Sequence, residues 1–383
     1  MASQASSVSV SREHQGWLGL RTPDPLLVLL SAATAILVLL VFAVPLDLAD
    51  GSGVVLATLL AMTIVVALTP PLIRKMKAGG MVGYDINKSQ KVEVAELGGI
   101  AAVFAFSVSL SLVVGIQKLV GDVAEPPFLA AISVFFMAAM VGLIDDISDL
   151  PQRLKAVAVA FAALPLMLVH LGAPIISFPF GYQWNFTGNW HLWYWLVLVP
   201  VGVTGVANAM NMSAGYNGLE TGQIAVISAA LLVVGFLRGA TDVSVLVFGA
   251  ILGCALGMYY FNRFPARIFI GDIGALGLGA ALAAGVIQAH IEFYGLVAIS
   301  PAFFELAATV YFGFKGHNGN RKKACRNPDI GIDGRLSPPR GASHYTLAYW
   351  ILAKRPMKER SLVHALLALY AVAGTIAIAL SVL

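Results

Sequence analysis

The residues with the strongest chemical character are carboxylates at the end of an apolar run. Asp145 and Asp146 stand together there, and Asp149 lies about one helical turn after Asp145, on the same helical face. Carboxylates this close repel one another unless a cation relieves them, and Arg153 and Lys155 follow within about three turns. Because acids at a helix C-terminus oppose the macrodipole, an ordinary solvated helix end is the weaker interpretation. The segment predicts a metal or phosphate site.

A second polar segment, residues 208–223, combines carboxamides with glycine. Asn208 and Asn211 lie at positions i and i+3, and Asn217 and Glu220 follow among three glycines. Carboxamide oxygens are hard ligands for Mg²⁺, and a glycine-rich turn offers backbone amides to phosphate. The alternative is an ordinary helix C-cap and turn.

Asp272 and the segment 85–99 are weaker signals of the same kind. Asp272 follows Gly271 at the start of a very apolar helix, where an acid can also be a simple N-terminal cap. The segment DINKSQKVEVAELGG at 85–99 is either a functional loop or a basic loop attracted to anionic lipid headgroups. Its last residues, Gly98 and Gly99, open the next helix and permit a close backbone approach there.

Segment 315–360 is too long and too basic for a short connector. Its cations, placed opposite acids on one membrane surface, suit a polyanionic substrate such as a nucleotide diphosphate; the alternative is the ordinary excess of Lys and Arg in cytoplasmic loops. In the apolar run before it, Glu305 is an isolated charge, which indicates either a functional site or a pair with a neighbouring helix. The cations at the core of the segment are His317, Arg321, Lys322, Lys323, Arg326, Arg335 and Arg340.

The elements that carry these residues must be membrane-spanning helices. Hydrophobic residues make up 58% of the 383 residues and charged residues only 11%, with a mean hydropathy of +0.83. Soluble domains carry about a quarter charged residues. Runs of roughly 20 apolar residues recur along the chain, which is the length that a helix needs to cross a bilayer, and they lack the alternation of a membrane β-barrel. The predicted fold class is an all-α polytopic membrane protein.

Eleven apolar segments are predicted to span the membrane, or ten if the ninth and tenth form one broken helix. Lys and Arg concentrate in cytoplasmic loops. With the N-terminus inside, all of them except Lys118 and Arg238 fall on the cytoplasmic side, where the polar motifs also lie. Catalytic loops are therefore expected to face the cytoplasm. The predicted spans are 26–44, 53–73, 98–117, 128–144, 155–172, 192–210, 223–237, 243–261, 275–291, 295–314 and 361–382.

In this order, the motifs resemble the polyprenyl-phosphate N-acetylhexosamine-1-phosphate transferase superfamily, and within it the eukaryotic and archaeal branch that acts on UDP-GlcNAc and dolichyl phosphate. The resemblance rests on DINK, GLIDDISDL with Lys155 downstream, NAMNMSAGYNGLETGQ and FIGDIG. It implies attack of a lipid phosphate on the β-phosphorus of a UDP-sugar, with release of UMP, as the first step of lipid-linked glycan assembly. Residues 53–383 would form the transferase membrane domain, preceded by a loose cytoplasmic tail at 1–25 and an additional helix with its outer loop at 26–52.

The resemblance also implies roles for the residues near the reacting phosphates. Asp145 and Asp146 match the tandem aspartates of the family, with Asp145 as the base or orienting group for the lipid phosphate. Lys155 matches the lysine that contacts the pyrophosphate. Asn211 and Asp272 match the ligands of Mg²⁺, for which Mn²⁺ could substitute.

The remaining matched residues concern the nucleotide. Arg321 matches an arginine that contacts the pyrophosphate from the last large loop. Asn217, Glu96 and the backbone of Ile86 fall where the family holds uridine. Phe269 falls where a ring stacks on uracil.

Departures from the family pattern indicate the branch. The bacterial branches carry a His-rich motif in the last large loop, whereas here only His317 stands near the Arg and Lys residues. This disfavours the MurNAc-pentapeptide and enterobacterial-antigen types. Ala95 replaces the proline that usually precedes the residue matched by Glu96. The last large loop aligns only loosely beyond Lys323, and sugar recognition in the family resides largely in this loop.

The expected partners are a UDP-HexNAc donor, a polyprenyl or dolichyl phosphate acceptor, membrane lipid and a second copy in a homodimer; nucleic acid is not expected. Compact loops favour a prokaryotic origin, and the expected location is an archaeal plasma membrane. A lipid phosphate is already largely ionised at neutral pH, since the second pKa of a comparable phosphate is about 6, so a single displacement without a strong base is favoured. The alternative function is a secondary transporter of an anionic substrate, but the polar motifs gather at one surface and no internal repeat is evident.

Overall fold

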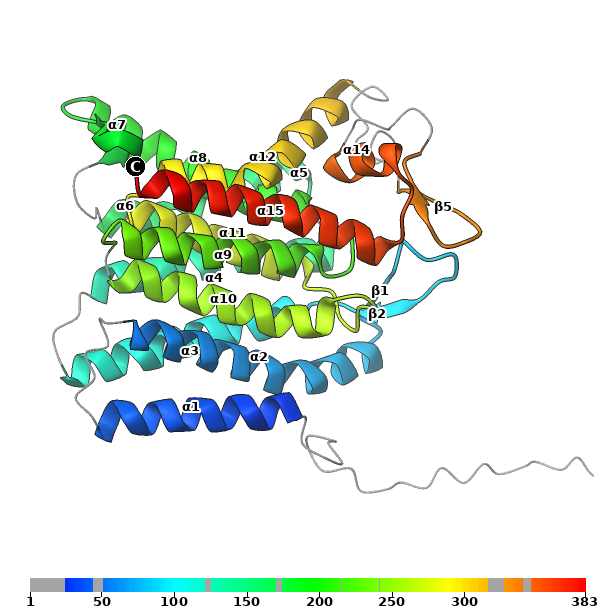
Figure 1. Ribbon diagram of the computed structural model, residues 1–383, viewed down its shortest axis with the longest axis horizontal. Coiled ribbons are helices and arrows are strands. Elements are labelled where there is room, and N and C mark those ends of the chain that lie inside the picture. The colour runs from blue at the N-terminus through cyan, green and yellow to red at the C-terminus, as the bar shows by residue number, and fades with distance from the viewer. Residues whose placement is uncertain are drawn as a thin grey trace, which may run out of the picture.

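The computed structural model describes residues 25–43, 51–120, 125–169, 174–213, 215–240, 242–315, 327–339 and 346–383. They form a bundle of long helices that lie side by side, as Figure 1 shows. Within this part of the chain, nine helices are long and apolar enough to cross a membrane, which confirms the predicted fold class. The helices are α1 (Pro25–Ala43), α2 (Ser52–Ala78), α3 (Gly99–Val120), α4 (Glu125–Ser148), α5 (Gln152–Phe161), α6 (Leu164–Val169), α7 (Trp190–Trp193), α8 (Val199–Met212), α9 (Leu219–Leu237), α10 (Asp242–Asn262), α11 (Gly271–Gln288), α12 (Glu292–Lys315), α14 (Leu347–Lys354) and α15 (Glu359–Ser381).

Two predicted spans are outside those nine. The additional N-terminal span is α1, an apolar helix of 19 residues that packs against α2, with a hydrogen bond of 3.2 Å between the hydroxyls of Thr34 and Thr63. The preceding tail, residues 1–24, lies outside the described residues.

The fifth predicted span, 155–172, was wrong as a single helix, because the structure divides it into α5 and α6. Two residues, Ala162 and Ala163, form a turn between these helices, and their N–H groups donate to carbonyls three residues back. Pro165 is the second residue of α6 and has no N–H to donate to the carbonyl of Phe161, so one hydrogen bond of a continuous helix is missing at this point.

The ninth and tenth spans are separate helices. A turn at residues 289–291 joins α11 to α12, and His290 adopts a positive φ of 52° in it. The sixth span is continuous from Trp190 to Met212, with a π-helical stretch at Tyr194–Leu198 between α7 and α8. The ninth and tenth predicted spans are therefore two helices rather than one broken helix.

Among the described residues, short strands form three two-stranded antiparallel hairpins at the ends of the bundle. β1 (Val82–Tyr84) pairs with β2 (Glu93–Ala95), and β5 (Asp329–Ile330) pairs with β6 (Leu336–Ser337). Both hairpins lie at the same end of the bundle as α14, whereas β3 (Ile175–Ser177) and β4 (Gln183–Asn185) connect α6 to α7 at the other end (Figure 1). The basic loops and the polar motifs therefore share one end.

The helix α11 lies in the core, because its sequence is rich in Gly and Ala. Every residue of α11 from Ile273 to Gln288 is buried. A Cβ atom added at Gly279 would lie 2.8 Å from the Cα of Ala207 on α8, and one added at Gly285 would lie 2.7 Å from the ring of Phe248 on α10. Small residues permit this close helix packing in membranes. The start of α11 is thereby placed among the ends of its neighbours.

Candidate active site

The first turn of α11 is held by the end of α4. A Cβ atom added at Gly142 would lie 2.3 Å from the carbonyl oxygen of Asp272, so only glycine permits this approach. The carboxylate of Asp146 then accepts hydrogen bonds from the N–H groups of Asp272, at 2.8 Å, and Ile273, at 3.0 Å. Gly271 adopts a φ of +72° beside this carboxylate. Asp146 therefore caps the helix that carries Asp272.

The sequence left open whether Asp272 is a simple N-terminal cap or a site residue, and this arrangement distinguishes the two. The side chain of Asp272 is not the cap of its own helix, because Asp146 accepts from the first N–H groups. It instead accepts a close hydrogen bond from Lys155 Nζ and one of 3.0 Å from Asn211 Nδ2. The carboxylate of Asp272 therefore has no capping role and can take part in metal binding or catalysis.

Lys155 joins the ends of three helices. Its ammonium donates to Asp145 Oδ2 at 2.6 Å and contacts Asp272 Oδ2, and its side chain is buried. The turn between α4 and α5 makes this possible: Asp149 has a positive φ of 49°, and the N–H of Leu150 donates to Asp145 Oδ1 at 2.7 Å. The structure therefore brings the predicted residues Asp145, Asp146, Lys155, Asn211 and Asp272 into one connected site.

The site carries more negative than positive charge. Three aspartates surround one lysine, and Glu220 in the first turn of α9 lies close enough to Asp146 and Asp272 to interact electrostatically. Carboxylates held this close favour a bound cation. Glu220 belongs to the polar motif at 208–223 but was not among the predicted site residues.

Glu96 and Phe269 lie on two adjoining backbone segments next to this site. The N–H of Phe269 donates to the carbonyl of Ala95 at 2.8 Å, and the N–H of Gly98 donates to the carbonyl of Phe269 at 2.8 Å. A Cβ atom added at Gly99 would lie 2.4 Å from the backbone nitrogen of Gly274, which confirms the predicted close approach at this glycine pair. Burial and the neighbouring Asp146 raise the pKa of the Glu96 carboxyl.

Asn217 belongs to a second polar network, and Ile86 lies next to two of its members in the chain. Asn217 Nδ2 donates to Asp85 Oδ2 at 2.8 Å, and the backbone N–H of Asn217 donates to Glu359 Oε1 at 2.9 Å. Ile86 is half exposed and follows Asp85 in the chain. The sequence did not single out Glu359, because an acid in the first turn of a helix is usually explained by the macrodipole alone.

The isolated Glu305 contacts the backbone of a neighbouring short helix. Its Oε1 accepts a hydrogen bond of 2.8 Å from the N–H of Leu347, the first residue of α14. It lines a cavity of about 190 Å³ together with Ile86, Ser213, Tyr216 and Tyr349. Arg321, the predicted pyrophosphate contact, lies outside the described residues.

A metal ion at Asp272 and Asn211 fits the chemistry of these side chains. Within the described ranges, no group of three or more His, Cys, Asp and Glu side chains is arranged to hold a metal. Mg²⁺ does not need such a group of three side chains, because it usually keeps several waters and binds through one or two carboxylates and the phosphates of its substrate. The adjacent carboxylate of Asp272 and carboxamide of Asn211 would supply the protein oxygens.

The chain is similar in sequence to known proteins. The model of glycosyl transferase family 4 matches residues 128–290, from α4 to the turn after α11. A Saccharolobus solfataricus protein provisionally named UDP-N-acetylglucosamine–dolichyl-phosphate N-acetylglucosaminephosphotransferase is 32% identical over 267 residues, which cover 69% of this chain and 80% of that protein. A Sulfolobus acidocaldarius protein with the same provisional name is 30% identical over 273 residues, covering 69% and 80%.

A bacterial relative matches a shorter region. The phospho-N-acetylmuramoyl-pentapeptide-transferase of Limosilactobacillus fermentum is 34% identical over 136 residues, which cover 34% of this chain and 42% of that protein. The shared family is one of enzymes, which disfavours the transporter hypothesis. The chain therefore belongs to glycosyl transferase family 4, whose members transfer a sugar 1-phosphate from a UDP-sugar to a lipid phosphate.

Proposed function

We propose that the protein transfers N-acetylglucosamine 1-phosphate from UDP-GlcNAc to a polyprenyl or dolichyl phosphate, releasing UMP, as the first step of lipid-linked glycan assembly. The observation that carries the proposal is the ammonium of Lys155, held between Asp145 and Asp272 with Asn211 beside them. The choice of GlcNAc and dolichyl phosphate is supported by the provisional names of the two archaeal relatives.

Phosphoryl transfer depends more on positioning and charge neutralisation than on covalent chemistry. In a single displacement, an oxygen of the lipid phosphate bonds to the β-phosphorus of the donor, and the bond from that phosphorus to the bridging oxygen breaks. UMP leaves with the bridging oxygen. Lys155 neutralises charge on the pyrophosphate, and Asp145 orients the lipid phosphate.

Mg²⁺, or Mn²⁺ in its place, is the proposed cofactor, held by Asp272 and Asn211. When bound, the ion would neutralise phosphate charge in the transition state. Asn211 contacts Asp272 through its nitrogen, and its carboxamide oxygen would be the ligand. The uridine would lie against Glu96, Phe269, Asn217 and the backbone of Ile86.

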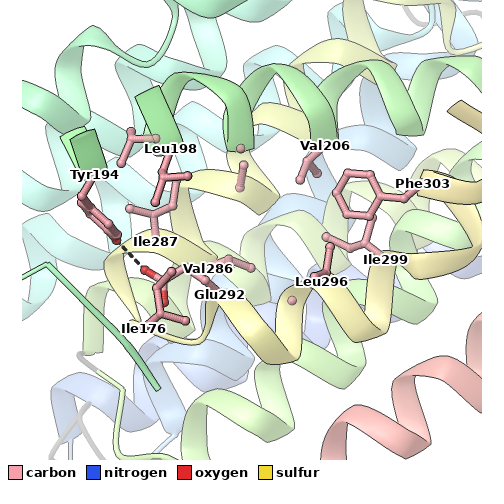
Figure 2. A pocket seen from close by; sticks show the side chains of 14 residues that line it. Ile176, Tyr194, Leu198, Val206, Val286, Ile287, Glu292, Leu296, Ile299 and Phe303 are labelled. Carbon is pink, nitrogen blue, oxygen red and sulfur yellow. Dashed lines mark hydrogen bonds between the residues drawn. The ribbon is translucent and has the colours of Figure 1, made fainter. Parts of the chain in front are cut away.

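An apolar acceptor suits the helices beyond the polar end. A cavity of about 220 Å³ runs between α8 and α12, from Tyr194 and Glu292 toward Val206 and Phe303, and Figure 2 shows its apolar lining. The hydroxyl of Tyr194 donates to Glu292 Oε1 at 2.5 Å at one end of it. Such a cavity can accommodate part of a hydrocarbon chain. The distribution of Lys and Arg supports an active site on the cytoplasmic face of the membrane.

Product analysis tests the proposal. Purified protein is incubated with Mg²⁺, a panel of UDP-HexNAc donors and polyprenyl phosphates of different length and saturation, and the lipid products are identified by mass spectrometry. We expect a GlcNAc-pyrophosphate-linked lipid and one UMP per product. Product formation from another donor, with none from UDP-GlcNAc, would refute the assigned sugar.

A further inference from the structure

The buried carboxylate of Glu359 connects α15 to two loops at the polar end of the bundle. Glu359 is 4% exposed. Its Oε1 accepts from the backbone N–H of Asn217 at 2.9 Å and from Asn87 Nδ2 at 3.2 Å, while its Oε2 accepts from Lys88 Nζ at 2.5 Å. One side chain therefore fixes the loop after β1 and the loop between α8 and α9.

The two loops are also fixed to each other. Asn87 Nδ2 donates to the carbonyl of Gly215 at 2.6 Å, and Asn217 Nδ2 donates to Asp85 Oδ2 at 2.8 Å. Lys88 lies 3.0 Å from Asp85 as well as 2.5 Å from Glu359, so one cation pairs with both acids. A buried carboxylate is stable only when it is paired and hydrogen-bonded in this way.

These contacts determine the position of the residues assigned to uridine. Ile86 lies between Asp85 and Asn87, which are both part of the network. Asn217 is held at its backbone by Glu359 and at its carboxamide by Asp85, so that the orientation of its side chain is fixed. Neither acid is among the residues that the family resemblance assigns to substrate.

A third loop is tied to the same place. The carbonyl of Met357, two residues before Glu359, accepts a hydrogen bond of 2.9 Å from the N–H of Leu336 in β6. The start of α15 thus joins the 327–339 segment of the long basic loop to the two loops that carry Ile86 and Asn217.

We propose that Glu359 is a positioning residue for the nucleotide part of the donor. It sets the distance and orientation between Ile86 and Asn217 without contacting the donor itself. The proposal rests on the proposed function, in which Ile86 and Asn217 hold uridine.

The test compares Glu359→Gln and Glu359→Ala with a matched control. Gln288→Ala is that control, because Gln288 is also a buried polar residue with a side-chain hydrogen bond, to the carbonyl of Pro127, but it is the last residue of α11, the helix whose first turn carries Asp272. For each variant, thermal stability in detergent, kcat, donor KM, acceptor KM and the dissociation constant of UMP are measured.

We expect Glu359→Ala to raise the donor KM and the UMP dissociation constant by about tenfold or more, as for the loss of a hydrogen bond to a charged group. Glu359→Gln keeps an oxygen acceptor but loses the charge that pairs with Lys88, so it should raise both constants by about threefold or more. The acceptor KM should stay unchanged, and kcat should change by less than about twofold. Gln288→Ala should lower the thermal stability and leave donor and UMP binding unchanged.

If Glu359→Ala does not fold, Glu359→Gln decides. Glu359→Gln could have a reduced thermal stability but the same donor KM and UMP affinity as the unsubstituted protein. That result would show that Glu359 only stabilises the fold. This outcome is distinct from failure of the proposed function, in which the unsubstituted protein itself neither binds UMP nor uses a UDP-sugar.

Discussion

Asp146 on α4 caps the helix that carries Asp272, with 2.8 Å between its Oδ1 and the Asp272 backbone nitrogen. The two aspartates therefore have different tasks, although both resemble acids of the active site. Asp146 holds the N-terminus of α11 in place, and Asp272 presents its side chain to Lys155 and Asn211. The interhelical cap is what positions Asp272 at the centre of the polar end.

Asp146→Ala is expected to destabilise the protein as well as inactivate it. Loss of a helix cap lowers the free energy of unfolding by about 0.5–2 kcal/mol. Thermal unfolding in detergent and UMP release measure the two effects. Asp272→Ala is the comparison, because it leaves the cap intact and should reduce activity more than stability. Equal stabilities of the two variants would contradict the separate roles.

Asp272→Ala and Asn211→Ala are each expected to lose metal-dependent activity while the protein still folds. Both remove an oxygen that would bind Mg²⁺. Asn211→Asp should keep partial activity, since it retains an oxygen ligand. Titration of activity with Mg²⁺ checks this, and normal turnover by either alanine variant at ordinary Mg²⁺ concentration would refute the assignment of the ligands.

Lys155→Met is expected to reduce kcat by about a hundredfold or more, because it removes a cation preorganised for the transferring phosphoryl group. Steady-state kinetics with both substrates saturating measures the loss. Lys77→Ala on the exposed end of α2 is the control and should behave like the unsubstituted protein. A comparable loss of kcat in Lys77→Ala would mean that positive charge anywhere on this surface supports turnover and that Lys155 has no specific role.

Arg321→Ala is expected to raise the donor KM or lower kcat by an amount equivalent to about 1.5–3 kcal/mol, for a lost hydrogen bond to a charged group. Lys354→Ala is its control, since the Lys354 ammonium lies over the ring of Trp350 at 3.6 Å. The donor KM and kcat of the two variants are compared. Equal and small effects would show that Arg321 only contributes to the positive charge of the loop.

The donor KM is expected to depend on the ionisation of Glu96. Because burial and Asp146 raise the pKa of this carboxyl, it takes up a proton at a higher pH than an ordinary glutamate does. If its ionised form accepts a hydrogen bond from uridine, the donor KM should rise as the pH falls through this raised pKa. Glu96→Gln should abolish that rise. An identical pH profile in both proteins would exclude Glu96 from donor binding.

The sequence predicted the helices well because a spanning helix must be apolar over its whole length. It also indicated a cluster of Asp145, Asp146 and Lys155, since these residues are near one another in the chain. The break at Pro165 was missed, although the proline was visible, because hydropathy does not register a missing N–H donor.

Contacts between distant segments could not be predicted in the same way. The cap from Asp146 to Asp272 spans 126 residues, and the contact from Glu359 to Asn87 spans 272. Nothing local distinguishes Glu359 from any acid at a helix start, because its partners come from other loops. Only the packed bundle brings them together.

The position of Lys155 between two aspartates has a consequence for turnover. In the proposed reaction, donor phosphates would take up an ammonium that already has two partners, so the binding energy is the difference between the new contacts and the lost ones. When UMP departs, Asp145 and Asp272 would pair with the lysine again, which would favour release of the nucleotide. An internal counterion of this kind would weaken donor binding and speed product release, which suits an enzyme whose nucleotide product retains a phosphate.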